Sequence, residues 1–402
     1  MGVLRCHEIK SYLEALKHTL CYNNSPLKGR EVKILDTTLR EGEQAPSIYF
    51  SLEEKLAIAE MLDRACVDMI EISPVVSEEH EKATKQLVEA GFRNAEVIGH
   101  VRALKSDVDV AVRCGVGWVA LYMSISDIHL KYKLGISRDE ALKRIRESVS
   151  YAKKQGLNVR FSLEDASRAD PEFLRRAAVT AVKAGADRLS VTDTLGVMTP
   201  KGMYRLVKLV REAVEVPLDV HCHNDMGLAL ANSIAGLEAG ADQIHVSVNG
   251  IGERAGITSL SEAVIALRFL YGARVKVKTE LLSRLSNLVA KFSGIPLYPF
   301  TPLVGECAFT HKAGTHIAAV LKNPASYEPI PPGLVGNKRR ILFGVYSGKN
   351  AMSLLASILG LNVNGNGVRA MALNFKRACK GDVFGVELDE GSIRLLPLGE
   401  GK

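Results

Sequence analysis

Eight short runs of strand-forming residues, separated by segments with helical periodicity, follow one another from residue 32 onward. The segments 51–65 and 137–156, for example, repeat apolar positions at helical spacing. Several such segments end in glycine, which is typical of a helix C-terminus. The eight strand candidates are VKILDTTL (32–39), VDMIEIS (67–73), NAEVIGHV (94–101), WVALYMS (118–124), NVRFSLED (158–165), DRLSVTD (187–193), LDVHCHND (218–225) and DQIHVSVNG (242–250).

Eight strand–helix units of about thirty residues each match a (β/α)₈ TIM barrel in number and in size. An open, doubly wound α/β sheet more often has five or six strands, with a glycine-rich phosphate loop after the first. No such loop follows residues 32–39. The sequence therefore predicts a closed barrel, in which functional side chains collect at the carboxyl ends of the strands.

The regions flanking the barrel have a different pattern. We predict an N-terminal helical extension over residues 1–30, the barrel over 31–295, a proline- and glycine-rich linker subdomain over 296–345 and a small helical subdomain over 346–402. The part after the barrel is thus expected to be mostly helical, with loosely ordered last residues.

Bulk properties restrict the kind of protein. Of the 402 residues, 47% are hydrophobic and 24% are charged, as in ordinary globular proteins. No apolar stretch approaches the length of a membrane span, and the N-terminus lacks the apolar core of a signal peptide. The seven cysteines are scattered without a C-x-x-C pair, which favours a reducing cytoplasm over a disulfide framework.

The net charge of +7 comes from basic residues that are interleaved with acids. Only NKRR (337–340) forms a compact basic cluster. It could meet an anionic cofactor such as a CoA phosphate, or be a solvated loop. We expect neither a nucleic-acid partner nor a membrane partner.

The stretch HCHND (221–225) places two histidines two residues apart. On a strand, alternate side chains share a face, so His221, His223 and Asp225 would point the same way. A single histidine there would usually be an ordinary core residue. A pair at this spacing favours a metal site, with Asp225 beyond the strand end supporting the ligands by hydrogen bonding.

Nearly every predicted strand ends in polar or charged side chains, which would converge at one mouth of the barrel. Because buried polar groups must be satisfied or solvated, this convergence indicates an active site. Glu41 could add an oxygen ligand to His221 and His223, and Asn249 is a possible fourth ligand. Such nitrogen and oxygen donors suit Mg²⁺, Mn²⁺, Co²⁺ or Zn²⁺. Arg40 could neutralise an oxyanion or a carboxylate.

Three stretches, LDTTLREGEQ, HCHNDMGLALANS and VNGIGERAG, resemble the signature motifs of the acetyl-CoA-dependent 2-oxo acid synthases. These are the homocitrate, isopropylmalate and citramalate synthases, which are metal-dependent barrel enzymes. The resemblance extends from about residue 32 to 350. It implies Glu41, His221 and His223 as metal ligands, Arg40 as the oxyanion-stabilising residue and Thr194 as a substrate contact.

The segment FTHKAGTHIAAVLKNPASYE is similar to the family segment that lies over the barrel mouth of the partner subunit. The resemblance implies that His316 and Tyr327 join Glu164 as the proton-transfer group. It also implies a homodimer in which the C-terminal segment of one chain reaches the active site of the other, with acetyl-CoA as co-substrate.

The substrate expectation rests on VRFSLED, in which Arg160, Ser162 and Glu164 alternate and should all face the mouth. In homocitrate synthases an arginine at this place meets the distal carboxylate of 2-oxoglutarate, and His100 also resembles a residue of that group. We therefore expect a homocitrate synthase of lysine biosynthesis, most similar to archaeal examples. Asn249 and the short form EISPVVS favour isopropylmalate synthase instead, and citramalate synthase is a third alternative.

A hydroxyacyl-CoA lyase on the same barrel is the alternative of a different class. It would share the metal motif but should carry a catalytic cysteine in a glycine-rich loop, whereas Cys307 lies in GECAF. The chain ends at residue 402, before the full regulatory domain of leucine-sensitive relatives. Feedback inhibition, if present, would then have to act at the barrel mouth, for example through lysine competing with 2-oxoglutarate.

Overall fold

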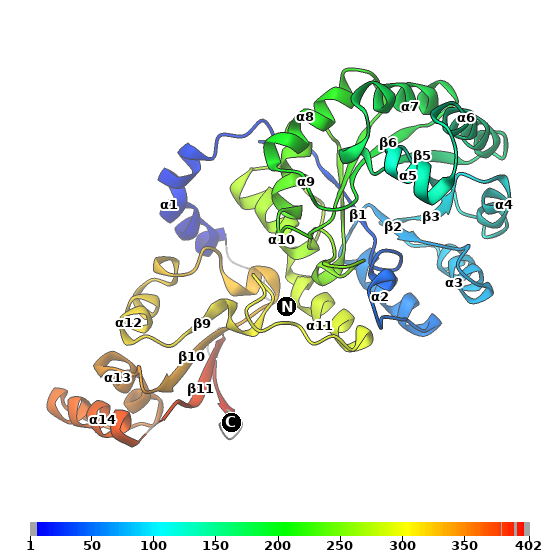
Figure 1. Ribbon diagram of the computed structural model, residues 1–402. Coiled ribbons are helices and arrows are strands. Elements are labelled where there is room, and N and C mark those ends of the chain that lie inside the picture. Colours follow the sequence, from blue (N-terminus) through cyan, green and yellow to red (C-terminus); the bar gives the residue numbers. More distant parts are fainter. Residues whose placement is uncertain (1–5, 379, 390–391, 398–402) are drawn as a thin grey trace. The chain divides into compact units, whose positions relative to one another are not determined.

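The computed structural model describes residues 6–378, 380–389 and 392–397. Its largest feature is a closed barrel of eight parallel strands, each paired with the next and the last paired with the first (Figure 1). The predicted (β/α)₈ barrel is confirmed, and each predicted strand overlaps an observed one. The barrel strands are β1 (Lys33–Asp36), β2 (Met69–Ile72), β3 (Glu96–Arg102), β4 (Trp118–Ser124), β5 (Asn158–Glu164), β6 (Arg188–Asp193), β7 (Leu218–Cys222) and β8 (Gln243–Val246).

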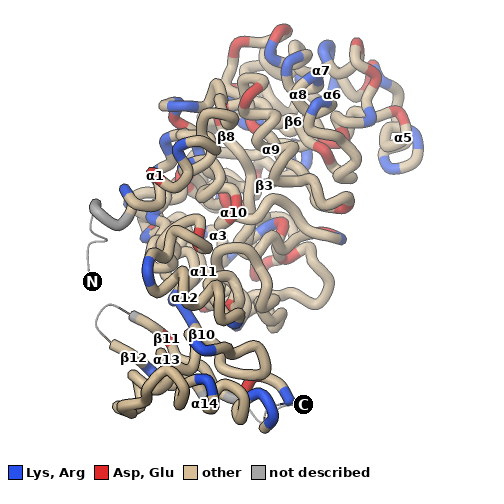
Figure 2. Tube along the Cα trace, turned by 90° about the vertical axis from the view of Figure 1, so that its left-hand side faces the viewer, with Lys and Arg blue, Asp and Glu red and all other residues tan. Residues whose placement is uncertain are grey.

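Helices surround these strands, as the barrel periodicity predicts (Figure 1). Basic and acidic residues are mixed along them (Figure 2). No helix in the described ranges is long and apolar enough to cross a membrane. The helices of this region are α2 (Leu52–Arg64), α3 (Glu78–Glu89), α4 (Lys105–Arg113), α5 (Asp127–His129), α6 (Arg138–Lys154), α7 (Pro171–Lys183), α8 (Pro200–Arg211), α9 (Ala229–Glu238), α10 (Leu260–Ile265) and α11 (Leu282–Ser293).

Local sequence signals explain where these helices begin and end. Ser51 and Glu54 form a capping box at the start of α2, and Asp170 caps α7 directly before Pro171. After α9, Gly240 adopts φ 112°, a conformation that other residues rarely tolerate. The chain therefore turns sharply from helix to strand.

Below the mouth, the first four strands fill the barrel with apolar side chains. Met69, Ile98 and Ala120 belong to one buried cluster with Leu35. Met69 lies two residues before Glu71 and so shares its face of β2. The mouth is therefore polar above an apolar floor on this side.

The chain divides into two units. Residues 24–279 and 284–296 form the barrel unit, and the described parts of 1–23, 280–283 and 297–402 form the second. The N-terminal helix α1 (Cys6–Tyr22) belongs to this second unit, together with α12 (Gly314–Lys322), α13 (Lys349–Ile358) and α14 (Gly365–Ala378).

The second unit also contains a four-stranded sheet in the order β12-β11-β10-β9, which the sequence did not predict. The expectation of loosely ordered last residues was wrong for β11 and β12, which pair with each other as antiparallel strands. A core that includes Ile341, Phe343, Met352 and Val386 joins sheet and helices. The strands are β9 (Thr310–His311), β10 (Arg339–Gly344), β11 (Asp382–Asp389) and β12 (Ser392–Pro397).

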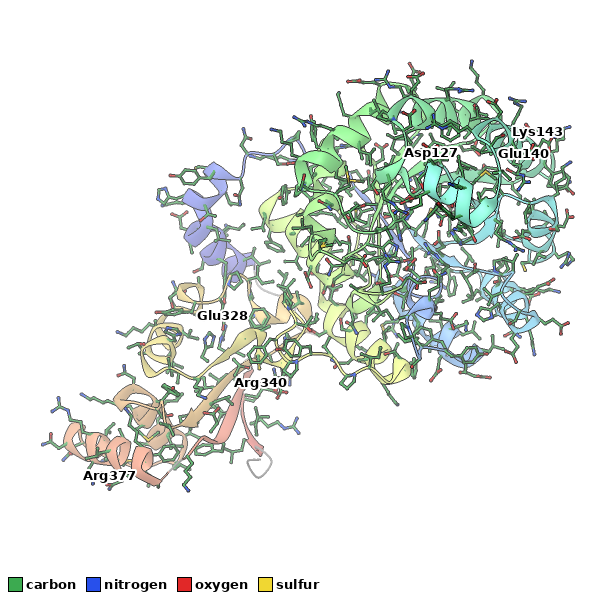
Figure 3. All side chains as sticks on the ribbon, in the orientation of Figure 1. Asp127, Glu140, Lys143, Glu328, Arg340 and Arg377 are labelled. Carbon is green, nitrogen blue, oxygen red and sulfur yellow. The ribbon has the colours of Figure 1, made fainter. Side chains whose placement is uncertain are left out.

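Buried Glu328 connects the N-terminal helix to this unit (Figure 3). Its carboxylate accepts hydrogen bonds from the Tyr12 hydroxyl at 3.0 Å and from Arg339 Nη2 at 2.7 Å, and His311 Nε2 lies 3.1 Å away. Burial, reinforced by the Glu328 carboxylate, raises the pKa of Tyr12 far above its ordinary value. The phenol therefore stays protonated and keeps its donor role.

Candidate active site

A cavity of about 270 Å³ opens at the carboxyl ends of the barrel strands. Nine of the residues that the sequence singled out line it, although they come from five separate barrel strands or the loops that follow them. These nine are Arg40, Glu41, His100, Arg160, Ser162, Glu164, Thr194, His221 and His223. The convergence expected from the strand ends is thus present in the folded chain.

Glu41, His221 and His223 form a buried group whose ligand atoms all lie within 4.8 Å of one another. The Nε2 atoms of the two histidines are 3.2 Å apart, and a Glu41 oxygen lies 3.8 Å from each. Two donors bound at about 2.1 Å to one tetrahedral ion lie about 3.4 Å apart. The group therefore fits a divalent metal.

The histidines are kept neutral, which metal binding requires. Burial, reinforced by His223 and Arg40, lowers the pKa of His221 well below its ordinary value. Burial also lowers the pKa of His223, against the opposing effect of Glu41. Both imidazoles thus present a lone pair at neutral pH.

Glu41 is positioned by two separate motifs. Its Oε1 accepts a hydrogen bond from the backbone N–H of Glu253 at 3.0 Å, and its Oε2 pairs with Arg40. A Cβ added at Gly252 would lie 2.9 Å from the Glu41 Cγ. Gly252 of NGIGER therefore leaves room for the side chain of Glu41 in LREGEQ, so these two distant motifs are in contact in the folded chain.

Glu71, which was not selected from sequence, lies between Arg40 and Arg160. Its Oε1 accepts from Arg40 Nε at 2.6 Å, and its Oε2 pairs with Arg160. Burial disfavours the charged carboxylate, but Arg160 and Arg40 outweigh this effect and hold the pKa of Glu71 well below its usual range. The sequence feature that could have identified Glu71 is that it is a single acid within an otherwise apolar strand.

Glu164 is held by groups on both sides. Its Oε1 accepts a hydrogen bond from Lys133 Nζ at 2.6 Å, and its Oε2 accepts one from the Ser124 hydroxyl. The ring of His100 stacks on Tyr122 with centroids 4.5 Å apart. Lys133 and Tyr122 line the cavity and were also missed from sequence.

Three predicted site residues do not line this cavity. Asn249 donates through Nδ2 to the Ser286 carbonyl at 2.9 Å, while its buried Oδ1 has no hydrogen-bond partner within the described chain. This leaves an oxygen available as a ligand atom. His316 and Tyr327 lie in the second unit, where their rings stack at 4.0 Å. They thus form a pair with each other.

The support of the metal ligands differs from the prediction. Asp225 accepts hydrogen bonds from Arg254 at 2.7 and 3.0 Å, and no hydrogen bond joins it to either histidine in the described part of the chain. Instead His245 lies against His221, with their Nδ1 atoms 3.3 Å apart. His245 was not selected from sequence because one histidine in a buried strand is usually a core residue.

Comparison with known families gives two matches that follow the chain's own division. The HMGL-like family profile matches residues 31–289. A second profile, described as homocitrate synthase post-HMGL domain-like, matches residues 303–382. The first match alone covers more than half of the chain.

Curated relatives of the chain carry three different names. A probable 2-isopropylmalate synthase of Methanopyrus kandleri is 48% identical over 83% of this chain and 66% of its own length. The 2-isopropylmalate synthase of Sulfurisphaera tokodaii is 46% identical over 87% of this chain and 92% of its own. The homocitrate synthase AksA of Methanopyrus kandleri is 47% identical over 82% of this chain and 83% of its own. An (R)-citramalate synthase of Methanocaldococcus jannaschii is 44% identical.

Among solved structures, the HMG-CoA lyase of Bacillus subtilis superposes with a TM-score of 0.62 at 21% identity, over 70% of this chain and 98% of its own. The HMG-CoA lyase of Brucella melitensis gives a TM-score of 0.59 at 20% identity. Such distant likeness shows the shared barrel fold and nothing about the reaction.

Proposed function

The chain belongs to the HMGL-like family, as an acetyl-CoA-dependent 2-oxo acid condensing synthase, and on this premise we propose that it is a homocitrate synthase. It would condense acetyl-CoA with 2-oxoglutarate and hydrolyse the resulting thioester, in the aminoadipate type of lysine biosynthesis. Its free thiols fit a cytoplasmic enzyme.

One observation supports 2-oxoglutarate as the substrate: the side chain of Arg160 is buried and lines the cavity. Arg40 and Arg160 balance the carboxylates of Glu41 and Glu71, with which they form ion pairs. A divalent ion then adds two positive charges, which a 2-oxo acid with a second carboxylate would neutralise. Arg160, with Ser162 and His100 beside it in the cavity, would meet the distal carboxylate.

The proposed reaction needs residues that bind the metal and residues that stabilise the alkoxide. Glu41, His221 and His223, with Asn249 as a weaker fourth donor, would hold Mg²⁺, Mn²⁺, Co²⁺ or Zn²⁺. When bound, the ion polarises the ketone of the 2-oxo acid. Arg40 lies beside the ligand Glu41 and would donate to the oxygen that becomes an alkoxide.

Proton transfer would use Glu164 with His316 and Tyr327 supplied by the second subunit of a homodimer. This group takes a proton from the methyl carbon of acetyl-CoA. The resulting carbanion bonds to the ketone carbon as the C=O π bond breaks, and the alkoxide, stabilised by hydrogen bonds from Arg40 and Thr194, takes up the proton that the Glu164 group removed from the methyl carbon. Water then cleaves the thioester, which releases the CoA thiol and a carboxylic acid.

Removal of the metal is expected to abolish thiol release. After dialysis against a chelator, kcat should fall to background, and addition of one of the four divalent ions should restore it. Thermal melting of the stripped protein checks that the barrel stays folded. Full activity of a protein that elemental analysis shows to be metal-free would contradict the metal site.

The substrate is tested by thiol release from acetyl-CoA with 2-oxoglutarate, 2-oxoisovalerate or pyruvate. We expect the highest kcat/KM with 2-oxoglutarate. Preference for 2-oxoisovalerate would establish the second candidate, a 2-isopropylmalate synthase, which is favoured by the engagement of Arg160 with Glu71 and by the names of several relatives. Preference for pyruvate would indicate a citramalate synthase. Thiol release with none of them, while a hydroxyacyl-CoA is cleaved, would indicate the lyase.

A further inference from the structure

A line of buried side chains runs from the metal group down into the barrel. His221 Nδ1 lies 3.3 Å from His245 Nδ1, and His245 Nε2 lies 3.2 Å from Asp219 Oδ2. Asp219 Oδ1 in turn accepts from Arg188 Nη1 at 2.5 Å. His245 and Asp219 are at most 1% exposed, so these contacts are shielded from bulk solvent.

The positions of the protons along this line follow from the donors and acceptors. His221 presents Nε2 to Glu41 and His223, so Nε2 must be free of hydrogen to bind an ion and Nδ1 must carry the proton. His221 therefore donates to His245 Nδ1. His245 then carries its own proton on Nε2, where the Asp219 carboxylate accepts it. Each group has one consistent role.

The two histidine ligands differ in this respect. The Nδ1 atom of His223 is buried and has no hydrogen-bond partner in the described chain. Of the two proposed ligands, only His221 therefore has a hydrogen-bond partner for its Nδ1 atom within the described residues. Arg160 Nη1 also lies 3.3 Å from His245 Nε2, but both atoms carry hydrogens in this arrangement. Their contact is therefore one of packing, and it places His245 between the metal ligand and the substrate-binding arginine.

We propose that His245, backed by Asp219, is a positioning residue that fixes the tautomer and ring orientation of His221 and thereby sets the affinity of the site for its metal. The inference rests on the proposed metal site and adds two residues that would not touch the substrate. Partners of this kind typically contribute 10–100-fold in metal affinity.

The test measures binding of Co²⁺ and of Zn²⁺ alone to the full-length, metal-stripped protein by calorimetry, together with the visible spectrum of the Co²⁺ form. His245→Leu should weaken binding about 10–100-fold and change the Co²⁺ spectrum. His245→Gln should recover most of the affinity, because its amide can accept from His221 and donate to Asp219. Asp219→Asn should weaken binding, because its amide N–H favours the wrong tautomer of His245.

The matched control is Ser190→Ala. Ser190 is fully buried, pairs in register with Asp219 and has a hydroxyl with no hydrogen-bond partner among the described residues, so its loss tests general loosening of the floor. It should bind Co²⁺ as the wild type does. Equal affinities of wild type and His245→Leu, or an equal loss in Ser190→Ala, would overturn the inference.

Two further results are decisive. If a thermal melt shows that His245→Leu does not fold, the metal affinities of His245→Gln and Asp219→Asn are compared instead. An affinity of Asp219→Asn equal to that of the wild type, and no tighter binding by His245→Gln than by Asp219→Asn, would then overturn the inference. If wild-type protein binds neither ion, the proposed metal site itself is wrong and the inference is overturned with it.

Discussion

Replacement of Arg40 by alanine is expected to lower kcat for CoA release by about 10²–10³. Arg40 is the largely buried cation next to Glu41, the proposed metal ligand, so it lies where negative charge would develop on the ketone oxygen. Its loss removes a donor that acts in the transition state, and kcat should fall along with kcat/KM.

The fold should survive this substitution, because Glu71 keeps Arg160 as a partner and Glu41 keeps the backbone N–H of Glu253. Arg102→Ala is the matched control. Arg102 ends strand β3 but pairs with Asp107 of α4 and does not line the cavity. It should leave kcat close to that of the wild type. If Arg40→Ala kept more than about a tenth of wild-type kcat, the oxyanion role would be wrong.

Replacement of Arg160 by glutamine should change which 2-oxo acid is preferred. Glutamine removes the charge but keeps an N–H for Glu71. We expect kcat/KM for 2-oxoglutarate to fall about 10–100-fold, the effect of losing a hydrogen bond to a charged group. The value for 2-oxoisovalerate should fall much less, because its side chain has no carboxylate for Arg160 to bind.

The ratio of the two kcat/KM values is the measurement that matters, since general damage would lower both alike. Arg188→Gln provides this comparison. Arg188 is the other buried arginine of the floor, bound to Asp219, and it does not line the cavity. It should lower both values in proportion. A ratio unaltered by Arg160→Gln would remove Arg160 from substrate selection and with it the support for homocitrate synthase.

Some of the site could be predicted because its signals are local. Arg40 and Glu41 directly follow a strand, and His221 and His223 alternate on one, so barrel geometry alone brings these four to the same mouth. Sequence could also select Arg160, since an arginine on an otherwise buried strand is unusual. Each of these predictions needed only a strand, its end and its alternation.

Other parts of the site depended on contacts between strands that are distant in sequence. Glu71 is one acid in an apolar run, and its importance becomes visible only when Arg40 from the end of β1 and Arg160 from β5 meet it. His245 gains its role from His221 and Asp219 of the neighbouring strand. No periodicity encodes which inward side chains face one another across a barrel.

In the C-terminal region, too, some elements could be predicted from sequence and others could not. The amphipathic pattern correctly predicted the helices α13 and α14, because a helix repeats its buried face every few residues. The sheet was missed, because β9 is two residues long and pairs with β10, which begins 28 residues later. A strand of that length carries no readable alternation.

The sequence by itself therefore determined the barrel, the mouth at which polar side chains collect, and the residues that we propose to bind a metal and an oxyanion. These properties repeat along the chain or follow directly from strand ends. Only the tertiary structure decided how the buried charges are paired and which side chain supports His221. The protonation and hydrogen bonding of a buried ion or imidazole depend on its nearest partner in space. That partner comes from whichever strand the barrel places beside it.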